Sequence, residues 1–290
     1  MVYVNHLVEK EIRMGNEIFG LDILYIILLM GVGMFAGFLN TVAFGGSLLT
    51  LPTLVYLVPF AIDVPSLPVG TDETNIANGT NRVAIIFQNF SAILGFRRKG
   101  VSNFRHAITL TIPAVLGASI GAYIATLTSY KVFKPVLAIV MVSMLFLTLF
   151  NPTEWLQGKF NPSGTQHKIV ASIALFFVGI YGGFIQAGVG LLVIATLRII
   201  DGGDLVITNA LKVFIIFFYT IIALGIFVFK GHVNWILGFT LAAGNATGAW
   251  IGSHLAVKMG DKWIKVVLVV TVIAYVIKLL WDTLRDLGFI

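Results

Sequence analysis

Two cationic side chains lie inside long apolar runs of this sequence. Arg82 and Lys212 each fall within one helical turn of a Thr-Asn pair, Thr80-Asn81 in one case and Thr208-Asn209 in the other. A cation at the centre of a bilayer costs about 2.5–3.5 kcal/mol on insertion scales, so it normally faces a cavity or a partner. The chemistry that these residues predict is the binding of an anion. The alternative is that both cations lie near helix ends and extend their charged tips to the membrane surface.

Amide side chains recur around equivalent positions in the two halves of the chain. Asn40 and Gln186 stand beside glycine-rich interruptions of two apolar runs, and Asn81 and Asn209 come early in the helices that follow. Where a helix is interrupted, the free N–H groups at the start of its second arm carry the positive end of a helix dipole. We therefore interpret these amides as ligands of an anion. Helix capping is the alternative for Asn81 and Asn209.

Glycines at the two interruptions would let the backbone approach a ligand without a Cβ atom in the way. The first interruption lies within Gly37–Pro52 and the second within Gly183–Leu197. Tight helix crossing, which small residues also support, is the alternative explanation of these glycines. The predicted substrate-binding residues are Asn40, Gly45, Gly46, Asn81, Arg82, Gln186, Gly188, Gly190, Asn209 and Lys212.

Acidic side chains are scarce at membrane depth, which argues against a cation site and against catalysis. The five histidines are not grouped with carboxylates at metal-ligand spacing, and no Gly-rich nucleotide-binding motif ending in Lys-Ser/Thr occurs. We predict that the protein is not an enzyme and has neither a metal site nor a cofactor. His254 is a candidate carrier of a coupling proton, although a lone histidine on a small-residue face is more often structural. The acids nearest the two interruptions fall in the loops after them: Asp63, Asp72, Glu73, Asp201 and Asp204.

The composition places these residues in a helical membrane protein. The chain is 58% hydrophobic and 11% charged, whereas a soluble domain carries about 25% charged residues. Its mean hydropathy is +0.97. Blocks such as 136–150 are apolar on every side, which excludes the alternating pattern of a transmembrane β-barrel. The net charge of +6 resides in short loops between apolar runs, which is typical of cytoplasmic loops and not of a nucleic-acid-binding domain.

Successive apolar runs predict an all-α polytopic bundle. We expect helical runs over 21–41, 48–60, 76–96, 104–128 and 130–150. The expected organisation is an N-terminal surface segment over 1–21, a first membrane repeat over 22–150, a linker over 151–167 and a second membrane repeat over 168–290. The first segment is polar and charge-mixed, unlike a signal peptide.

The second half of the chain repeats the first. Gly37–Asn40 aligns with Gly183–Gln186 at an offset of 183 − 37 = 146, and Thr80-Asn81 aligns with Thr208-Asn209 at 208 − 80 = 128. A third match relates Gly117 and Gly121 to Gly248 and Gly252 at 248 − 117 = 131, and the Lys pair at 131 and 134 recurs at 262 and 265 with the same offset. Matches at small and polar positions indicate two copies of one design.

The relative orientation of the two repeats depends on the interrupted runs. If each run makes a re-entrant hairpin or a pair of crossings, each half crosses the membrane an odd number of times and the halves are inverted, with both termini outside. If each run crosses once, the halves are parallel and both termini lie inside. Arms of about 20 and 13 apolar residues around Gly45 and Gly46 are too long for one crossing. We therefore favour inverted repeats with broken or re-entrant helices at the centre.

The ordered motifs resemble the TauE/SafE family of sulfite and organosulfonate exporters, also known as the toluene sulfonate uptake permease family. The likeness extends from about Leu24 to Trp281 and rests on GFLNTVAFGGSLLTLP, the Thr-Asn helix starts, the RRKG loop, PAVLGASIGAYIA with its repeat GNATGAWIGSHLA, and GFIQAGVGLL. The resemblance implies a plasma-membrane transporter of sulfur-containing anions with about eight membrane helices in two homologous halves.

Our hypothesis is a multi-pass secondary transporter in the plasma membrane that moves sulfite, a sulfonate or a sulfoacetate-like anion by alternating access. An anion channel and a transporter of a non-sulfur organic anion are the alternatives. The expected partners are the small anionic substrate, the lipid bilayer and a coupling proton or ion, and a homodimer is compatible with this hypothesis. No nucleic acid is expected.

Overall fold

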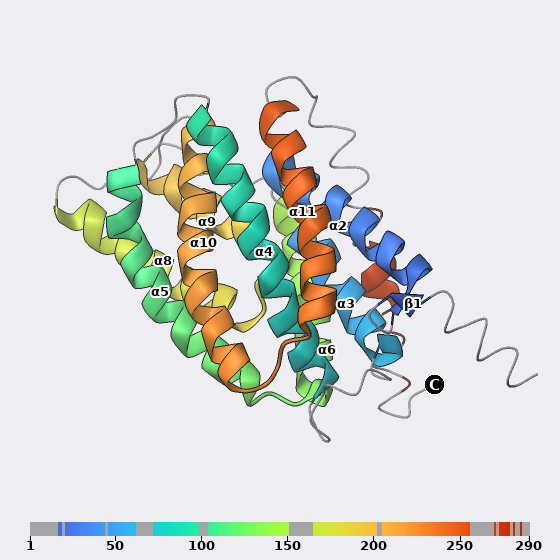
Figure 1. Cartoon of the computed structure of the whole chain (residues 1–290). Helices are drawn as coiled ribbons and strands as arrows, with labels where there is room; N and C mark the ends of the chain where they lie inside the picture. The colour runs from blue at the N-terminus through green and yellow to red at the C-terminus, as the bar shows by residue number, and fades with distance from the viewer. Residues whose placement is uncertain are drawn as a thin grey trace, which may run out of the picture.

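The computed structural model describes residues 17–18, 21–43, 46–61, 72–98, 104–150, 165–201 and 205–255, together with 270, 273–278, 281 and 285. Nearly all of these residues are helical (Figure 1). Two short strands, β1 (Glu17–Ile18) and β2 (Leu21–Asp22), pair antiparallel before the first described helix. The helices are α2 (Ile23–Ala43), α3 (Ser47–Ala61), α4 (Glu73–Arg98), α5 (Phe104–Thr126), α6 (Tyr130–Phe150), α8 (Thr165–Phe184), α9 (Val189–Asp201), α10 (Leu205–Phe229) and α11 (Trp235–Leu255).

The helices coincide with the apolar runs of the sequence to within a few residues. Helix α4 begins earlier than its apolar run because Asp72 caps it: the carboxylate accepts hydrogen bonds from the backbone N of Thr74 at 3.0 Å and from its Oγ1 at 2.6 Å. The same carboxylate accepts a bond from the backbone N of Tyr130, the first residue of α6. Arg97 and Arg98 end α4, where cations complement the helix dipole.

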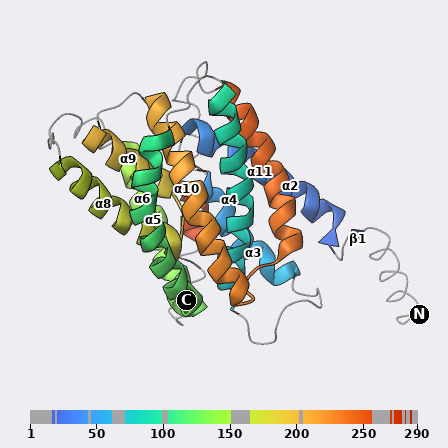
Figure 2. The same cartoon turned by 60° about the vertical axis from the view of Figure 1, so that its left-hand side comes forward.

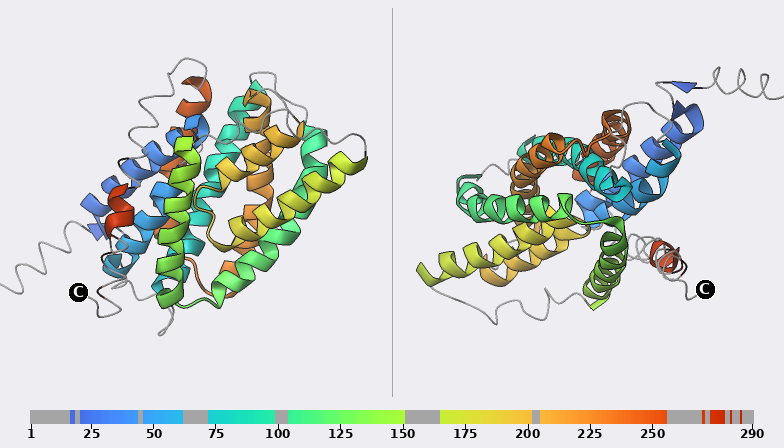
Figure 3. Two further views of the ribbon diagram at one scale, coloured as in Figure 1. Left: turned by 180° about the vertical axis from the view of Figure 1, so that it is seen from behind. Right: turned by 90° about the horizontal axis from the view of Figure 1, so that it is seen from below.

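Six helices form a row in the order α8, α5, α10, α4, α11 and α2, each packed against the next. Figure 2 shows α4 between α10 and α11, with α2 beyond α11, and Figure 3 gives the view from below. Helix α3 packs against α2 and α4, and α9 packs against α8 and α10. Exchanging α2 with α8, α4 with α10, and α11 with α5 reverses the row, so every pair of neighbours is kept.

Both ends of this row are close helix pairs built on glycines four residues apart. In the pair of α5 and α8, a Cβ atom at Gly117 would collide with the carbonyl of Phe176, and one at Gly121 with that of Ile180. In the pair of α2 and α11, Gly244 and Gly248 lie in the same way against the carbonyls of residues 30 and 34. In each pair the residue numbers of the contacts increase together along the two helices, so the helices run parallel. Because glycine has no side chain, the two backbones approach closely.

The two central helices, α4 and α10, run antiparallel. Val83 near the start of α4 packs with Phe227 near the end of α10, whereas Phe96 near the end of α4 packs with Ala210 near the start of α10. Phe90 meets Phe217 midway, with ring centroids 6.1 Å apart.

The chain reverses direction at each of the two interruptions. Helix α4 runs parallel to α11, because Gly79 lies against His232 and Gly95 against Ser253. Helix α2 is also parallel to α11, so α3 must return the chain to the side from which α2 starts. At the other end of the row, α8 and α10 both run parallel to α5, so α9 makes the equivalent return.

By length and hydropathy, three described helical segments are able to cross a membrane: Ile23–Thr41, Ala107–Thr126 and Val206–Phe229. Shorter apolar segments include Ser47–Val58 and Ile169–Phe184. Helix α8 begins at Thr165, so it includes the end of the predicted linker. Residues 1–16 and 151–164 lie outside the described residues, as does most of the chain beyond 255.

Candidate functional site

The two helix interruptions touch each other at the centre of the molecule. Gly188 donates a hydrogen bond from its backbone N to the Ser47 Oγ at 3.0 Å. Gly188 has a φ of 69° and Gln186 a φ of 64°, so the chain leaves helical geometry between α8 and α9 through two left-handed residues. Gly46 packs so closely on Ala36 and Asn40 that a Cβ atom would not fit. The start of α3 and the start of α9 therefore meet.

Arg82 is fully buried in α4 and binds the end of α8. Its Nη1 donates to the carbonyl of Gly182 at 3.3 Å and to the Gln186 Oε1 at 3.1 Å, and its Nη2 donates to the carbonyl of Gly183. Its guanidinium carbon lies 4.7 Å from the centroid of the Phe227 ring. Within the described residues only Nε lacks an acceptor.

Two amides complete this cluster around the end of α8. Asn78, one turn before Arg82, donates from Nδ2 to the carbonyl of Phe184 at 2.7 Å and accepts from Arg82 at 3.3 Å. The Gln186 Nε2 donates to the Thr220 Oγ1 at 2.9 Å, which links the interruption to α10. The last carbonyls of α8 have no partner inside their own helix, so these donors satisfy them.

Lys212 and Asn209 bind the end of α2 in the same way. The Lys212 Nζ donates to the carbonyl of Asn40 at 2.9 Å, and the Asn209 Nδ2 donates to the carbonyl of Thr41 at 2.9 Å. Both side chains are buried. A cation and an amide from α10 thus cap α2, as a cation and an amide from α4 cap α8.

The donors of these contacts match between the two halves at one offset, whereas their acceptors Phe184 and Thr41 differ by 184 − 41 = 143. Asn78 and Asn209 perform the same task at 209 − 78 = 131, the offset that also relates Gly117 to Gly248. The sequence comparison instead aligned Asn81 with Asn209 at 128, and at 131 the counterpart of Asn81 is Lys212. The first half therefore caps the interrupted helix of the second half, and the second half caps that of the first.

Arg82 and Lys212 lie toward opposite ends of the antiparallel pair of α4 and α10. Arg82 lies eight residues before Phe90, so the pairing of Phe90 with Phe217 places it opposite residue 217 + 8 = 225. That residue is thirteen positions beyond Lys212, which corresponds to about 20 Å along the helix axes. Each cation meets helix carbonyls. In the described parts of the chain, acidic residues occur only at or next to the ends of helices and strands: Glu17, Asp22, Asp72, Glu73 and Asp201.

Helix α4 carries a row of buried polar side chains, the polar stripe, which includes Asn78, Asn81, Arg82 and Gln88. The Gln88 Oε1 accepts a hydrogen bond from the Asn245 Nδ2 at 3.2 Å, which joins the stripe to α11. Asn81 is also fully buried, yet neither atom of its amide has a hydrogen-bond partner among the described residues. The Oγ1 of Thr50, near the start of α3, is buried in the same state.

The structure brings most of the predicted site residues together around the two interruptions. Gly190 is buried in the first turn of α9, and Gly45 lies outside the described residues. Arg82 and Lys212 are both fully buried inside the protein, so neither charged group reaches the surface of the molecule. The sequence reasoning missed Asn78, Ser47 and Thr50. The offset of 131 could have identified Asn78, whereas nothing local distinguishes Ser47 or Thr50.

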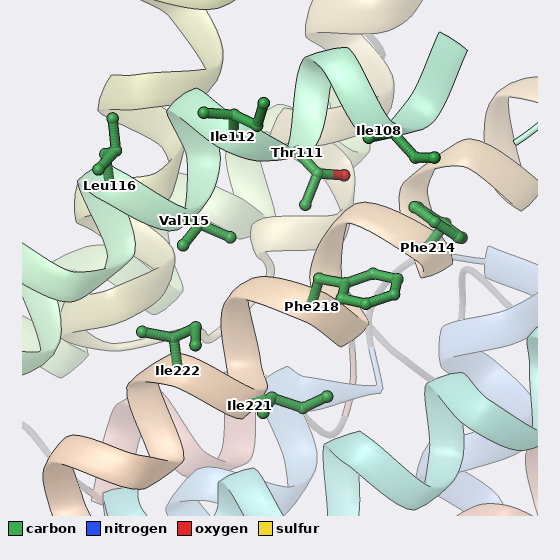
Figure 4. A pocket seen from close by; sticks show the side chains of 9 residues that line it. All are labelled: Ile108, Thr111, Ile112, Val115, Leu116, Phe214, Phe218, Ile221 and Ile222. Atoms are coloured by element: carbon green, nitrogen blue, oxygen red, sulfur yellow. The ribbon is translucent and has the colours of Figure 1, made fainter. Parts of the chain in front are cut away.

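An apolar groove between α5 and α10 lies away from this site (Figure 4). It offers no charged group to an anion, and several of its side chains are exposed in the way expected of a lipid-facing surface. Its lining residues are Ile108, Thr111, Ile112, Val115, Leu116, Phe214, Phe218, Ile221 and Ile222.

Comparison with known proteins gives one family and several relatives. The family model described as sulfite exporter TauE/SafE matches residues 29–279. A "probable membrane transporter protein ORF9" of Sinorhizobium is 27% identical over 87% of this chain and 91% of its own length. A "probable membrane transporter protein YfcA" of Escherichia coli K12 is 28% identical over 92% of this chain and 94% of its own length. A "probable membrane transporter protein" of Haemophilus influenzae is 25% identical over 91% of this chain and 96% of its own length. No solved structure gives a significant match.

Proposed function

Because this chain belongs to the sulfite exporter TauE/SafE family, we propose that it is a secondary transporter that moves a small sulfur-containing oxyanion across the plasma membrane. The relatives described above are named as membrane transporters, and their matches span almost the full length of both chains. The proposed substrate class is sulfite, a sulfonate or a sulfoacetate-like anion.

The observation that carries this proposal is the pair of buried cations at the two interruptions. Arg82 and Lys212 are fully buried, and each donates to carbonyl oxygens, which carry only partial negative charges. No carboxylate among the described residues binds Arg82 in an ion pair. A bound oxyanion would complement the positive potential of this region, and the N-termini of α3 and α9 would add to that potential.

The proposed substrate-binding residues are the predicted set around the two interruptions. Asn40 and Gln186 end the first arms, and Gly46, Gly188 and Gly190 begin the second arms. Arg82 and Lys212 supply positive potential from two places about 20 Å apart along α4 and α10. The guanidinium of Arg82 lies at the end of α8 and the ammonium of Lys212 at the end of α2, so we assign the two cations to attract the anion at two stages of one pathway.

We further propose that the halves are inverted repeats that alternate in their access to the two sides. The antiparallel packing of α4 and α10 supports inversion, because these helices carry the matched Asn78 and Asn209. The reversal of the chain at each interruption supports it too, since it gives each half an odd number of passages. Each half holds a helix end of the other, so a change in access would rearrange the bonds of Arg82 or Lys212.

A ligand screen by thermal denaturation tests the substrate class. Purified protein is heated with sulfite, sulfate, methanesulfonate, acetate or chloride at equal ionic strength, because a ligand that binds the folded state raises Tm with its concentration. We expect sulfite or methanesulfonate to raise Tm in a saturable manner and chloride to have no such effect. Saturable stabilisation by acetate alone would point to a non-sulfur organic anion, and no saturable shift with any anion would contradict the proposal.

A further inference from the structure

The amide of Asn81, which has no hydrogen-bond partner among the described residues, marks a specific place in the structure. It lies on α4 between one helix face that packs near α3 and another that binds the end of α8. On one flank, Ala77 and Ala84 belong to the same core cluster as Leu48 and Leu51 of α3. On the other, Asn78 and Arg82 bind the end of α8. Since residues three and four apart share a helix face, Asn81 faces the space between the start of α3 and the end of α8.

Thr50 faces the same space from the other side. It follows Ser47 by three residues, so the two side chains share one face of α3, and Ser47 contacts Gly188 of the second interruption. The Thr50 hydroxyl is buried and has no acceptor or donor among the described residues. Two buried polar side chains that lack partners among the described residues therefore lie on the faces of α4 and α3 that border the junction of α3 and α9.

Burial without a partner is costly, which makes these two groups informative. An unsatisfied buried polar group loses hydration that nothing replaces, and most buried groups in folded proteins are paired. The neighbours of Asn81 each have at least one partner: Asn78 binds Phe184, Arg82 binds Gly182 and Gln88 binds Asn245. In Asn81, by contrast, both amide atoms lack a partner among the described residues. A transport site must bind its cargo and release it, so side chains without a partner among the described residues are candidates to bind the cargo.

The junction also offers the positive end of a helix. Helix α3 has 15 residues and starts at Ser47. Leu49 and Thr50 donate their backbone N–H groups to the Gly46 carbonyl, so the N–H groups of Ser47 and Leu48 are the ones in this turn that lack an acceptor among the described residues. Helix α9 has 13 residues and starts beside it, after Gly188. Helix N-termini with an adjacent amide and hydroxyl provide donors for an oxygen-rich anion, whereas a metal cation would require carboxylates.

We propose that Asn81 and Thr50 donate hydrogen bonds to the oxyanion at the N-terminus of α3, while Arg82 and Lys212 act as positioning residues. This assignment rests on the proposed function. The terminal nitrogens of Arg82 are bound to Gly182, Gly183, Gln186 and Asn78, and the ammonium of Lys212 is bound to Asn40. The cations hold the helix ends around this proposed binding site, which we call the seat. The neutral donors Asn81 and Thr50 contact the anion.

The test measures unfolding and ligand binding on the same purified variants. Asn81→Leu and Thr50→Val remove the unpaired groups, Asn81→Asp keeps the size and adds a negative charge, and Asn78→Leu is the matched control one turn away. We expect Asn81→Leu and Thr50→Val to keep or raise the Tm of the ligand-free protein, because an unsatisfied group is lost. Their Kd for sulfite or methanesulfonate should rise by about tenfold or more, and Asn81→Asp should lose the ligand-induced shift altogether.

The control and the contrary outcomes separate the seat from the proposed function. Asn78→Leu should lower the ligand-free Tm, because it breaks the bond to Phe184, while the Kd of the folded fraction changes by less than Asn81→Leu changes it. If wild type binds sulfite or methanesulfonate and Asn81→Leu binds it within about twofold, the seat is wrong and the proposed function stands. A fall in Tm for Asn81→Leu as large as that for Asn78→Leu, with unchanged affinity, would assign the amide to an internal structural role. Absence of binding by wild type would remove the proposed function itself.

Discussion

Arg82 donates a hydrogen bond to the carbonyl of Gly183, and this contact joins α4 of the first half to the end of α8 in the second. The side chain is fully buried and reaches two further acceptors on the same helix end and the following turn, Gly182 and Gln186. A cation at the C-terminus of a helix satisfies free carbonyls and complements the dipole. Arg82 is therefore a structural link between the halves as well as a source of positive potential.

Replacing Arg82 by Gln should destabilise the folded protein by about 3 kcal/mol, because buried carbonyls lose their donors. Arg97→Gln is the matched control, since Arg97 lies on the same helix but is exposed. Thermal and denaturant unfolding of the two variants in one detergent measures the difference. Similar small losses of stability in both variants would contradict the capping role of Arg82.

Replacing Gly121 by Ala should destabilise the protein by about 1–3 kcal/mol, because the new methyl group would collide with the carbonyl of Ile180 across the pair of α5 and α8. Gly31→Ala is the control: Gly31 is exposed in α2, and a methyl group there would meet no described atom beyond its own helix within 4 Å. This control should keep its stability or gain up to about 1 kcal/mol, because alanine is the better helix former. Equal behaviour of the two variants in unfolding experiments would contradict the close packing of α5 on α8.

His232, in the turn between α10 and α11, predicts a pH dependence of stability. Burial lowers the pKa of its imidazole below the ordinary value, Asp72 opposes this shift and Lys230 adds to it. Because the folded state binds this proton less tightly than the unfolded state does, the shift leaves the free energy of unfolding unchanged above the unfolded pKa of about 6.5. As the pH falls through that value, the unfolded state takes up the proton more readily and the folded state loses stability. Wild-type Tm should therefore fall from pH 7.5 to 5.5, and His232→Gln should show a smaller fall. An equal fall in both proteins would exclude His232 as the cause.

Labelling of single cysteines should place matched loops on opposite sides of the membrane. The sequence contains no cysteine, so each introduced thiol is unique. Arg98→Cys marks the end of α4 and Lys230→Cys the end of α10, and both positions are exposed. Inverted repeats predict that a membrane-impermeant maleimide labels Lys230→Cys in intact cells and Arg98→Cys only after lysis, because the basic cluster at Arg97 and Arg98 is expected in the cytoplasm. Labelling of both from the same side would support parallel repeats.

Local patterns of the sequence predicted the helices well, because each helix fills an apolar run with polar or glycine-rich ends. The run expected over 104–128 became α5 (Phe104–Thr126), and the run over 130–150 became α6 (Tyr130–Phe150). The glycines at 117 and 121 also indicated a close helix contact. The partner of that contact, α8, depends on packing between distant segments and could not be read from spacing alone.

The site residues illustrate the same limit. Buried Arg82 and Lys212 were recognisable as unusual, because cations in apolar runs are costly. Their acceptors are carbonyls of the other half, and a backbone carbonyl has no signature in a sequence. Asn78 and Asn81 look alike on one helix face, yet the structure gives Asn78 a partner in α8 and leaves Asn81 without one among the described residues. This difference arises from tertiary packing.

Counterflow in proteoliposomes tests the central claim most directly. Vesicles that contain the purified protein are preloaded with unlabelled methanesulfonate or sulfite, diluted, and supplied with the same anion labelled with a sulfur isotope outside. A carrier predicts that preloading accelerates and transiently concentrates the labelled anion, and that Asn81→Asp abolishes this effect at equal protein content. Single-channel conductance without acceleration by preloading, or uptake no faster than in protein-free vesicles, would contradict the account.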